Sequence, residues 1–192
     1  TPDDMLYYRK KFTYKKTNDR VLLHFGAVDY KCELTVNGRV MGTHTGGYYP
    51  FEVDITKVIV DGENEITLKV TDPSEMSSQA SGKQTSKRGN IWYTPQSGIW
   101  QTVWLEELPK EYINGLWITP SLNSVKIETV GGANHKKLTL NDKIYEFDGS
   151  YIKIDIDDPI HWSPENPYLY EFFIECGEDK IESYFALRTI TV

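Results

Sequence analysis

Apolar residues alternate with polar ones along almost the whole chain, and this alternation restricts the fold more than any other feature. Val21, Leu23 and Phe25 alternate in this way, as do Ile152, Ile154 and Ile156 in the second half. A period of two places every second side chain on the same face of a strand. Because no stretch of a dozen residues shows a helical repeat, we expect an all-β protein built from sandwiches of short strands.

Two turns can be located from the residues that form them. Asn37-Gly38 lies between two apolar runs, and both residues tolerate the positive φ that a two-residue hairpin turn needs. Asp61-Gly62 precedes another alternating run and predicts a turn that leads into a strand.

The charge distribution divides the chain into two parts. Residues 1–110 hold 14 basic and 14 acidic side chains, whereas residues 111–192 hold 7 and 14, so the whole net charge of −7 lies in the second part. We therefore expect one domain over 1–110 and another over 111–192. Cys32 and Cys176 fall on opposite sides of this boundary, each within an alternating run, and we interpret both as small buried apolar residues rather than a disulfide.

The composition excludes several classes of protein. No run approaches the roughly 18 apolar residues of a membrane helix. With 28 acidic against 21 basic residues and no basic stripe, nucleic-acid binding is not expected. No signal peptide is visible, which leaves the compartment open between the cytoplasm and the periplasm or exterior. The 192 residues are too few for a (β/α)8 barrel, which needs about 250.

The segment from 71 to 91 interrupts the alternation with Ser, Gly, Lys and Gln. A loop of this length is usually functional or disordered. Trp92 and Tyr93 follow it directly, and sugar rings stack well on such aromatic side chains, so we weigh a binding loop against a solvated, floppy one. A strand is expected to begin near Gly98, and Trp100 and Trp104 on it are expected in the core because both of its faces look buried.

Catalytic chemistry has little support in the sequence. The adjacent carboxylates Glu106-Glu107 and Asp157-Asp158 are expected to point to opposite faces of their strands, so neither pair supplies a facing acid and base. The four histidines show no metal-ligand spacing. We therefore expect no catalytic residue, no metal and no cofactor in this chain.

Several strings resemble glycoside hydrolase family 2, which includes β-galactosidases, β-glucuronidases and β-mannosidases. The N-terminal domain of that family resembles YYRKKF (7–12), RVLLHFGAVDYKCELTVNGRVMGTHTGGYYPFEVDIT (20–56), DGENEITLKVTDP (61–73), GKQ (82–84) and WYTPQSGIWQTVWLE (92–106). Its second domain resembles WITPSL (117–122) and HWSPENPYLYEFFIECGEDKIESYFALRTI (161–190). The resemblance implies a galactose-binding-like jelly-roll sandwich followed by an immunoglobulin-like β-sandwich.

The resemblance also implies where the chemistry of the parent protein lies. In the family, two catalytic glutamates stand on a barrel that follows the immunoglobulin-like domain. We therefore expect a non-catalytic, N-terminal fragment of a β-galactosidase-like enzyme, which supports the barrel of the same parent chain and shapes its sugar pocket. The alternative is an autonomous carbohydrate-binding or adhesion module. Oligomeric assembly is left open, and a carbohydrate is the expected ligand in either case.

The expected contacts at the rim of the sugar pocket are Arg88, Asn90, Trp92 and Tyr93, with His44 and Tyr48 behind them. For His44, a turn-stabilising role is the competing interpretation. β-Galactosidases of the family carry an acidic residue in the loop before Ser97-Gly98-Ile99, and this loop has only basic ones there. A basic loop would tolerate an acidic sugar.

Overall fold

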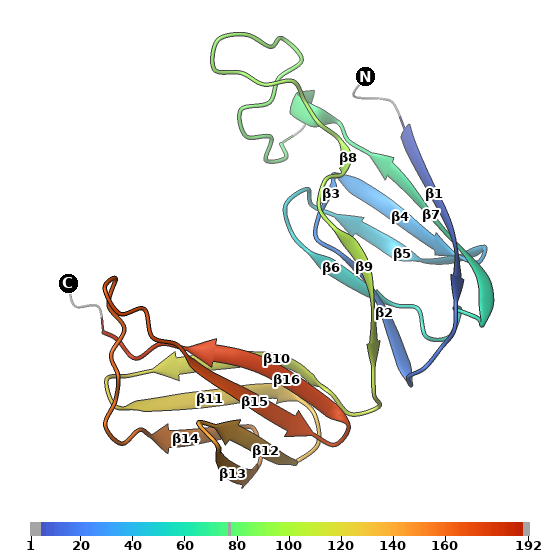
Figure 1. Cartoon of the computed structure of the whole chain (residues 1–192). Coiled ribbons are helices and arrows are strands. Elements are labelled where there is room, and N and C mark those ends of the chain that lie inside the picture. The colour runs from blue at the N-terminus through green and yellow to red at the C-terminus, as the bar shows by residue number, and fades with distance from the viewer. Residues whose placement is uncertain (1–4, 77, 190–192) are drawn as a thin grey trace. The chain divides into compact units, whose positions relative to one another are not determined.

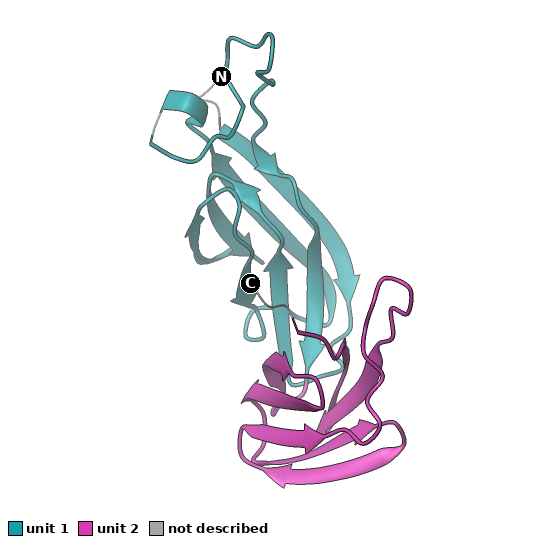
Figure 2. Ribbon diagram, turned by 90° about the vertical axis from the view of Figure 1, so that its left-hand side faces the viewer, with its two compact units in different colours: residues 1–108 teal, residues 109–192 magenta. Residues whose placement is uncertain are grey.

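The computed structural model describes residues 5–76 and 78–189, and the chain divides into two compact units (Figures 1 and 2). Unit 1 comprises residues 1–108 and unit 2 residues 109–192. Antiparallel strands build both units, and the short 3-10 helix Ser74–Met76 is the exception within the described ranges, so the all-β prediction is confirmed. No helix in these ranges is long and apolar enough to span a bilayer.

Unit 1 is a sandwich of two main sheets. A four-stranded sheet has the order β1-β7-β4-β5, a three-stranded sheet has the order β6-β2-β9, and β3 pairs with β8 beside them. The strands are β1 (Met5–Tyr14), β2 (Arg20–Phe25), β3 (Val28–Asp29), β4 (Lys31–Val36), β5 (Arg39–Thr45), β6 (Phe51–Asp54), β7 (Gly62–Thr71), β8 (Gly98–Ile99) and β9 (Val103–Leu108). This is the jelly-roll sandwich expected from the resemblance.

The alternating residues of unit 1 form its core. Inward-facing side chains of β2 meet those of β4 and β7 across the two sheets, and all of them are almost completely buried. These residues are Val21, Leu23, Phe25, Cys32, Leu34, Val36, Leu68 and Val70. A shift of one residue in any of these strands would expose its apolar set to water, so the alternation fixes the register.

The Asn37-Gly38 hairpin forms as predicted. Asn37 has φ 49° and Gly38 has φ 78°, and Val36 pairs with Arg39 across the turn. The Asn37 side chain adds to the turn, because its Nδ2 donates to the Val58 carbonyl at 2.8 Å and its Oδ1 accepts from the Glu65 amide at 2.8 Å. The turn thereby ties the β4–β5 hairpin to the start of β7.

Unit 2 is a second sandwich with the strand order of an immunoglobulin-like domain. One sheet has the order β10-β11-β14 and the other β13-β12-β15-β16. The strands are β10 (Ile113–Pro120), β11 (Ser124–Gly131), β12 (His135–Leu140), β13 (Lys143–Asp148), β14 (Tyr151–Asp155), β15 (Tyr170–Cys176) and β16 (Asp179–Phe185). Cys176 is buried in its core and Cys32 in that of unit 1, and both are free thiols, as predicted.

The prediction that Trp100 and Trp104 belong to the core is wrong. Trp100 is 49% exposed and Trp104 is 45% exposed. The expected single strand from Gly98 is interrupted, because β8 ends at Ile99 and β9 begins at Val103. In β9 the register places Leu105 opposite Leu23 on the inner face, which turns Trp104 outward, where its indole stacks on the His24 ring at 4.8 Å.

The long loop between β7 and β8, residues 72–97, projects beyond the end of the unit 1 sandwich (Figure 1). Its two ends are joined by the buried Asp72 carboxylate, which accepts hydrogen bonds from the Ser74 amide at 2.7 Å and from the Ser97 hydroxyl at 2.5 Å. Further along, the Ser86 amide donates to Glu75 at 2.9 Å. These bonds give the described part of the loop a defined path.

Candidate functional site

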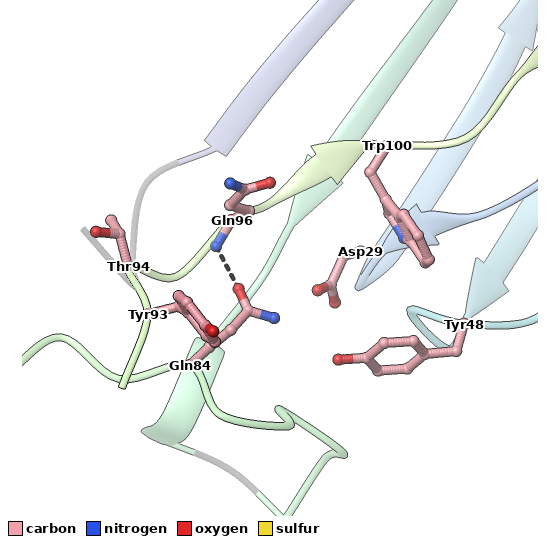
Figure 3. Close-up of a pocket in the computed structure, with 7 residues that line it drawn as sticks. All are labelled: Asp29, Tyr48, Gln84, Tyr93, Thr94, Gln96 and Trp100. Carbon is pink, nitrogen blue, oxygen red and sulfur yellow. Dashed lines mark hydrogen bonds between the residues drawn. The ribbon is translucent and has the colours of Figure 1, made fainter. Parts of the chain in front are cut away.

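A pocket of about 180 Å³ lies where the long loop meets the end of the unit 1 sandwich (Figure 3). Asp29, Tyr48 and Trp100 line it from the sandwich side, and loop residues face them from the other side. The loop residues are Gln84, Tyr93, Thr94 and Gln96. The pocket thus brings together residues as far apart in sequence as Asp29 and Trp100.

Backbone pairing within the loop positions its side of the pocket. The Tyr93 amide donates to the Lys83 carbonyl at 2.8 Å, and the Thr85 amide donates to the Tyr93 carbonyl at 3.0 Å. Gln84 lies between these two bonds, and its Oε1 accepts from the Gln96 amide at 2.6 Å, as the dashed line in Figure 3 marks. Gln84 and Tyr93 are therefore held in place before any ligand arrives.

The aromatic wall on the sandwich side is also fixed. Trp100 donates from its indole Nε1 to the Gly47 carbonyl at 2.7 Å, which fixes the ring against the Gly46-Gly47 turn. Tyr48 packs edge-on against Trp100, with ring centroids 5.9 Å apart and planes at 69°. Both rings are partly exposed, so they offer apolar surface to a ligand in the pocket.

Asp29 supplies the only carboxyl group among the described residues that line the pocket. It is 7% exposed, and its Oδ1 is buried without a hydrogen-bond partner among the residues that the structure describes. Gly47 packs directly on this group, since a methyl group at position 47 would lie 2.5 Å from Oδ1. Burial, and secondarily the charge of Asp72, raise the pKa of Asp29 to about 6.

Asp72 has the opposite character, although it is equally buried. Burial by itself would raise its pKa, but hydrogen bonds from Ser97, Gln79 and Ser74 outweigh that effect and hold the pKa below its ordinary value. Asp72 is therefore an ionised anchor of the loop, whereas Asp29 is an acceptor with one oxygen still unsatisfied. The different surroundings of these two carboxyl groups thus shift their pKa values in opposite directions.

Of the six residues predicted at the rim, Tyr48 and Tyr93 line the pocket. His44 stacks on Phe51 with ring centroids 4.0 Å apart, and its Nε2 lies 3.2 Å from the Gly46 carbonyl. This is the arrangement of a turn-stabilising side chain. His44 borders a separate hollow of about 430 Å³ along β4, β5 and β6.

The other three predicted residues lie on the loop outside the described lining of the pocket. Arg88 extends its Nη1 toward the Thr94 hydroxyl at 3.5 Å, which places it beside the rim. Asn90 adopts a positive φ of 55° in the turn that Gly89 and Trp92 close, and Trp92 is exposed.

Sequence reasoning missed most of the lining. Asp29 lies in the run AVDY and has the pattern of an ordinary strand residue, and nothing local marks it as a buried carboxyl group at the edge of a pocket. Trp100 was assigned to the core. Gln84, Thr94 and Gln96 lie within strings that resemble the family, GKQ (82–84) and WYTPQSGIWQTVWLE (92–106), and that resemblance was the signal that could have drawn attention to them.

The adjacent carboxylates Glu106 and Glu107 do not face each other. Glu106 lies 2.7 Å from His24 Nε2, whereas Glu107 accepts from the Tyr14 hydroxyl at 2.5 Å, so these neighbours point to opposite faces as predicted. Within the described residues, no three His, Cys, Asp or Glu side chains gather as ligands for a metal ion.

The chain matches family models along nearly its whole length. Residues 3–109 match the sugar binding domain of glycosyl hydrolases family 2, and residues 111–188 match a second domain of the same family. These two ranges correspond to the two units of the structure.

Two curated relatives are 29% identical to the chain over 95% of its length. One is a putative β-glucuronidase of Formosa agariphila, and the other is a β-galactosidase of Thermoanaerobacter pseudethanolicus. The chain covers 25% of the first and 28% of the second, so it spans about a quarter of the length of these relatives.

Solved structures show the same fold. A β-glucuronidase of Faecalibacterium prausnitzii has a TM-score of 0.77 at 25% identity, covering 97% of this chain and 38% of that one. A Bifidobacterium dentium β-glucuronidase complexed with coumarin-3-O-glucuronide has a TM-score of 0.80 at 21% identity, covering 98% of this chain and 40% of that one.

Proposed function

The chain belongs to glycosyl hydrolases family 2, and on that premise we propose that it is the non-catalytic, N-terminal part of a β-galactosidase-like enzyme. The parent protein hydrolyses O-glycosidic bonds in carbohydrate metabolism. Unit 1 shapes the sugar pocket and supports the catalytic barrel of the same parent chain, and unit 2 acts as a spacer.

The domain content of the chain and the greater length of its relatives support this assignment. The two units correspond to the two family domains, and relatives about four times as long carry the names of glycosidases. The resemblance implies that the two catalytic glutamates belong to a barrel that follows these domains. The activity is therefore assigned to the parent protein and the shaping of its pocket to this part.

The single observation that carries the pocket-shaping role is the lining of the unit 1 pocket. Tyr48, Tyr93 and Trp100 offer aromatic surface beside the carboxyl group of Asp29, which is a suitable combination for the apolar faces and hydroxyl groups of a sugar. The proposed rim comprises Tyr48 and Tyr93 in the lining, with Arg88, Asn90, Trp92 and His44 around it.

The activity test compares the 192-residue chain with the complete parent protein. Aryl β-galactoside, β-glucuronide and β-mannoside are offered to each, and the released aryl alcohol is followed by absorbance. We expect the parent to turn over the galactoside and the 192-residue chain to turn over none. Hydrolysis by the chain that a substitution within it abolishes would overturn the assignment.

The pocket-shaping role has its own test in the parent protein. Replacing Tyr48 by Ala is expected to raise KM for the galactoside at least fivefold, because a wall of the pocket is removed. The matched control is Tyr49→Ala, which removes an exposed ring beside it that does not line the pocket. Equal KM values for the two variants would contradict the role of unit 1.

An autonomous carbohydrate-binding or adhesion module is the second candidate. One observation favours it: the described lining residues all belong to unit 1, so the pocket forms without another chain or domain. A parent protein that binds glycans on an array yet hydrolyses none of the three aryl glycosides would support the module over the enzyme.

A further inference from the structure

The outer face of the β10-β11-β14 sheet in unit 2 carries two exposed aromatic side chains. Inward-facing residues such as Leu116 and Ile127 pack into the core of unit 2, which turns the residues between them outward. Trp117 on β10 is 68% exposed, and Tyr151 on β14 is 58% exposed. Large apolar side chains that stay exposed on the same face of a sheet mark an interaction surface.

The strand register fixes the spacing of the two aromatic residues. Strand β11 lies between β10 and β14 (Figure 1). Trp117 pairs with Glu128 on β11, and Glu128 pairs with Tyr151, so the three residues form one row across the sheet. Neighbouring strands lie about 4.8 Å apart, which places the two aromatic residues roughly 10 Å from each other.

Lys126 organises the polar part of this row. Its Nζ lies 2.9 Å from Oε1 of Glu128 and 5.1 Å from the centre of the Tyr151 ring, so it restrains both side chains. The Trp117 indole makes no hydrogen bond or ring contact with any residue that the structure describes, and its surface is open to a ligand. The row thus presents two aromatic rings with a charged, hydrogen-bonding pair between them.

The charges on this face balance, although unit 2 as a whole is acidic. Lys126 and Lys153 are register partners beside the aromatic row, and Glu128 and Asp155 supply two carboxylates on the same face. The excess of 14 acidic over 7 basic residues in 111–192 therefore lies elsewhere in the unit. A balanced face complements an uncharged ligand better than a polyanion or a polycation.

An extended β-1,4-linked polysaccharide matches the spacing and the chemistry of the row. Successive sugars of such a chain alternate in orientation, so every second sugar presents the same face, at a distance close to that between Trp117 and Tyr151. The C–H faces of these sugars stack on aromatic rings. The sugar between them can exchange hydrogen bonds with Glu128 and Lys126. A protein partner would have to bury this charged pair at the centre of the contact, where interfaces are depleted in charged residues.

We propose that the outer face of the β10-β11-β14 sheet is a binding platform for an extended, neutral β-1,4-linked polysaccharide, which lies across the strands with alternate sugars on Trp117 and Tyr151. Such a platform keeps the parent protein on a polymer and takes no part in hydrolysis. The proposal goes beyond the spacer role proposed for unit 2. It is independent of the unit 1 pocket, because all of its residues belong to unit 2.

The first test is calorimetric titration of the 192-residue chain with cellohexaose, cellobiose and maltohexaose. We expect cellohexaose to bind at least tenfold more tightly than cellobiose, which is too short to reach both rings, and than maltohexaose, whose α-linked chain coils. Maltohexaose binding that equals cellohexaose binding overturns the proposal, and so does the absence of cellohexaose binding. The complete parent protein is expected to match the chain within threefold. Binding that the parent lacks would mean that its other domains cover the face, which also overturns the proposal.

The second test assigns the binding to the aromatic row. Trp117→Ala and Tyr151→Ala are each expected to weaken cellohexaose binding at least tenfold, whereas Trp117→Phe, which keeps a ring, should stay within threefold. Tyr184→Ala is the matched control, since it removes an exposed ring from the outer face of the other sheet of unit 2. Unchanged binding by Trp117→Ala overturns the proposal. Loss of binding in Tyr48→Ala, which alters the unit 1 pocket, would place the polysaccharide there and overturn it as well.

The third test asks whether a second copy of the chain occupies the face instead. Analytical ultracentrifugation of the unmodified chain and of Trp117→Ala, both without sugar, is expected to give the same oligomeric state. A dimer that Trp117→Ala dissociates would assign the face to self-association and overturn the proposal.

Discussion

Replacing Asp29 by Asn is expected to stabilise unit 1 at neutral pH. The structure raises the pKa of Asp29 from its ordinary value of 3.8 to about 6, chiefly because the carboxyl group is buried. Each pH unit of that gap corresponds to about 1.4 kcal/mol, so ionised Asp29 destabilises the folded state by about 3 kcal/mol.

The sign of the pH dependence follows from the raised pKa. A carboxyl group that holds its proton more tightly in the folded state favours folding below pH 3.8, and this advantage is lost as the pH rises through about 6. Asn does not titrate. The stability difference between Asp29→Asn and the unmodified chain should therefore grow by about 3 kcal/mol between pH 3.5 and pH 7.5.

Taking the difference between the two proteins removes the contribution of other acids. Asp72 has a lowered pKa, so its stabilising contribution is lost as the pH falls, which is the opposite sign. Asp72 is present in both proteins and largely cancels. The titration of Asp29 is therefore the main pH-dependent part of the stability difference between the two proteins.

The assay is hydrogen exchange of buried amides in β2 and β4 over a denaturant series, because these amides report the unfolding of unit 1 separately from unit 2. Asp157→Asn in unit 2 is the control and should show no such growth. A difference that is constant with pH, or that shrinks as the pH rises, would refute the description of Asp29 as a buried acceptor without a partner.

Substitutions at three further positions test the packing of unit 1. Gly47→Ala places a methyl group 2.5 Å from Asp29 Oδ1, so it should cost about 1–3 kcal/mol in denaturant unfolding, and wild-type stability would contradict the close approach. Trp104→Ala should lower the free energy of unfolding by only about 1–2 kcal/mol, because the ring is half-exposed and stacks on His24. A loss above about 3 kcal/mol would indicate that the ring is part of the core. Asn37→Ala should cost about 2–3 kcal/mol by thermal unfolding, since it removes side-chain hydrogen bonds at a positive φ, and Asn37→Gly should recover the backbone part of that loss.

The sandwiches could be predicted from the sequence because their determinants are local. Alternation in runs such as Val21, Leu23 and Phe25 specifies both the strand and its buried face, and Asn37-Gly38 specifies the turn. Both signals lie within a few residues of the element they determine. Where a strand was interrupted, as between Ile99 and Val103, the same reasoning failed, and the half-exposed Trp100 was assigned to the core.

The pocket could be predicted only in part, because its chemistry is tertiary. The aromatic residues Tyr48 and Tyr93 were found from their place beside turns and a long loop. Asp29 was not, because its contact with Gly47 and the nearby charge of Asp72, which helps to raise its pKa, arise only from the tertiary fold. A carboxyl group in an alternating strand looks the same in sequence whether or not another segment packs on it.

Nuclear magnetic resonance can locate the bound sugar on the chain. The isotope-labelled 192-residue chain is titrated with methyl β-galactoside, and shifts of the backbone amides and the indole signals are followed. We expect shifts concentrated at Gln84, Tyr93 and the Trp100 indole, with unit 2 unaffected. Shifts confined to unit 2, or none at saturating sugar, would contradict this expectation.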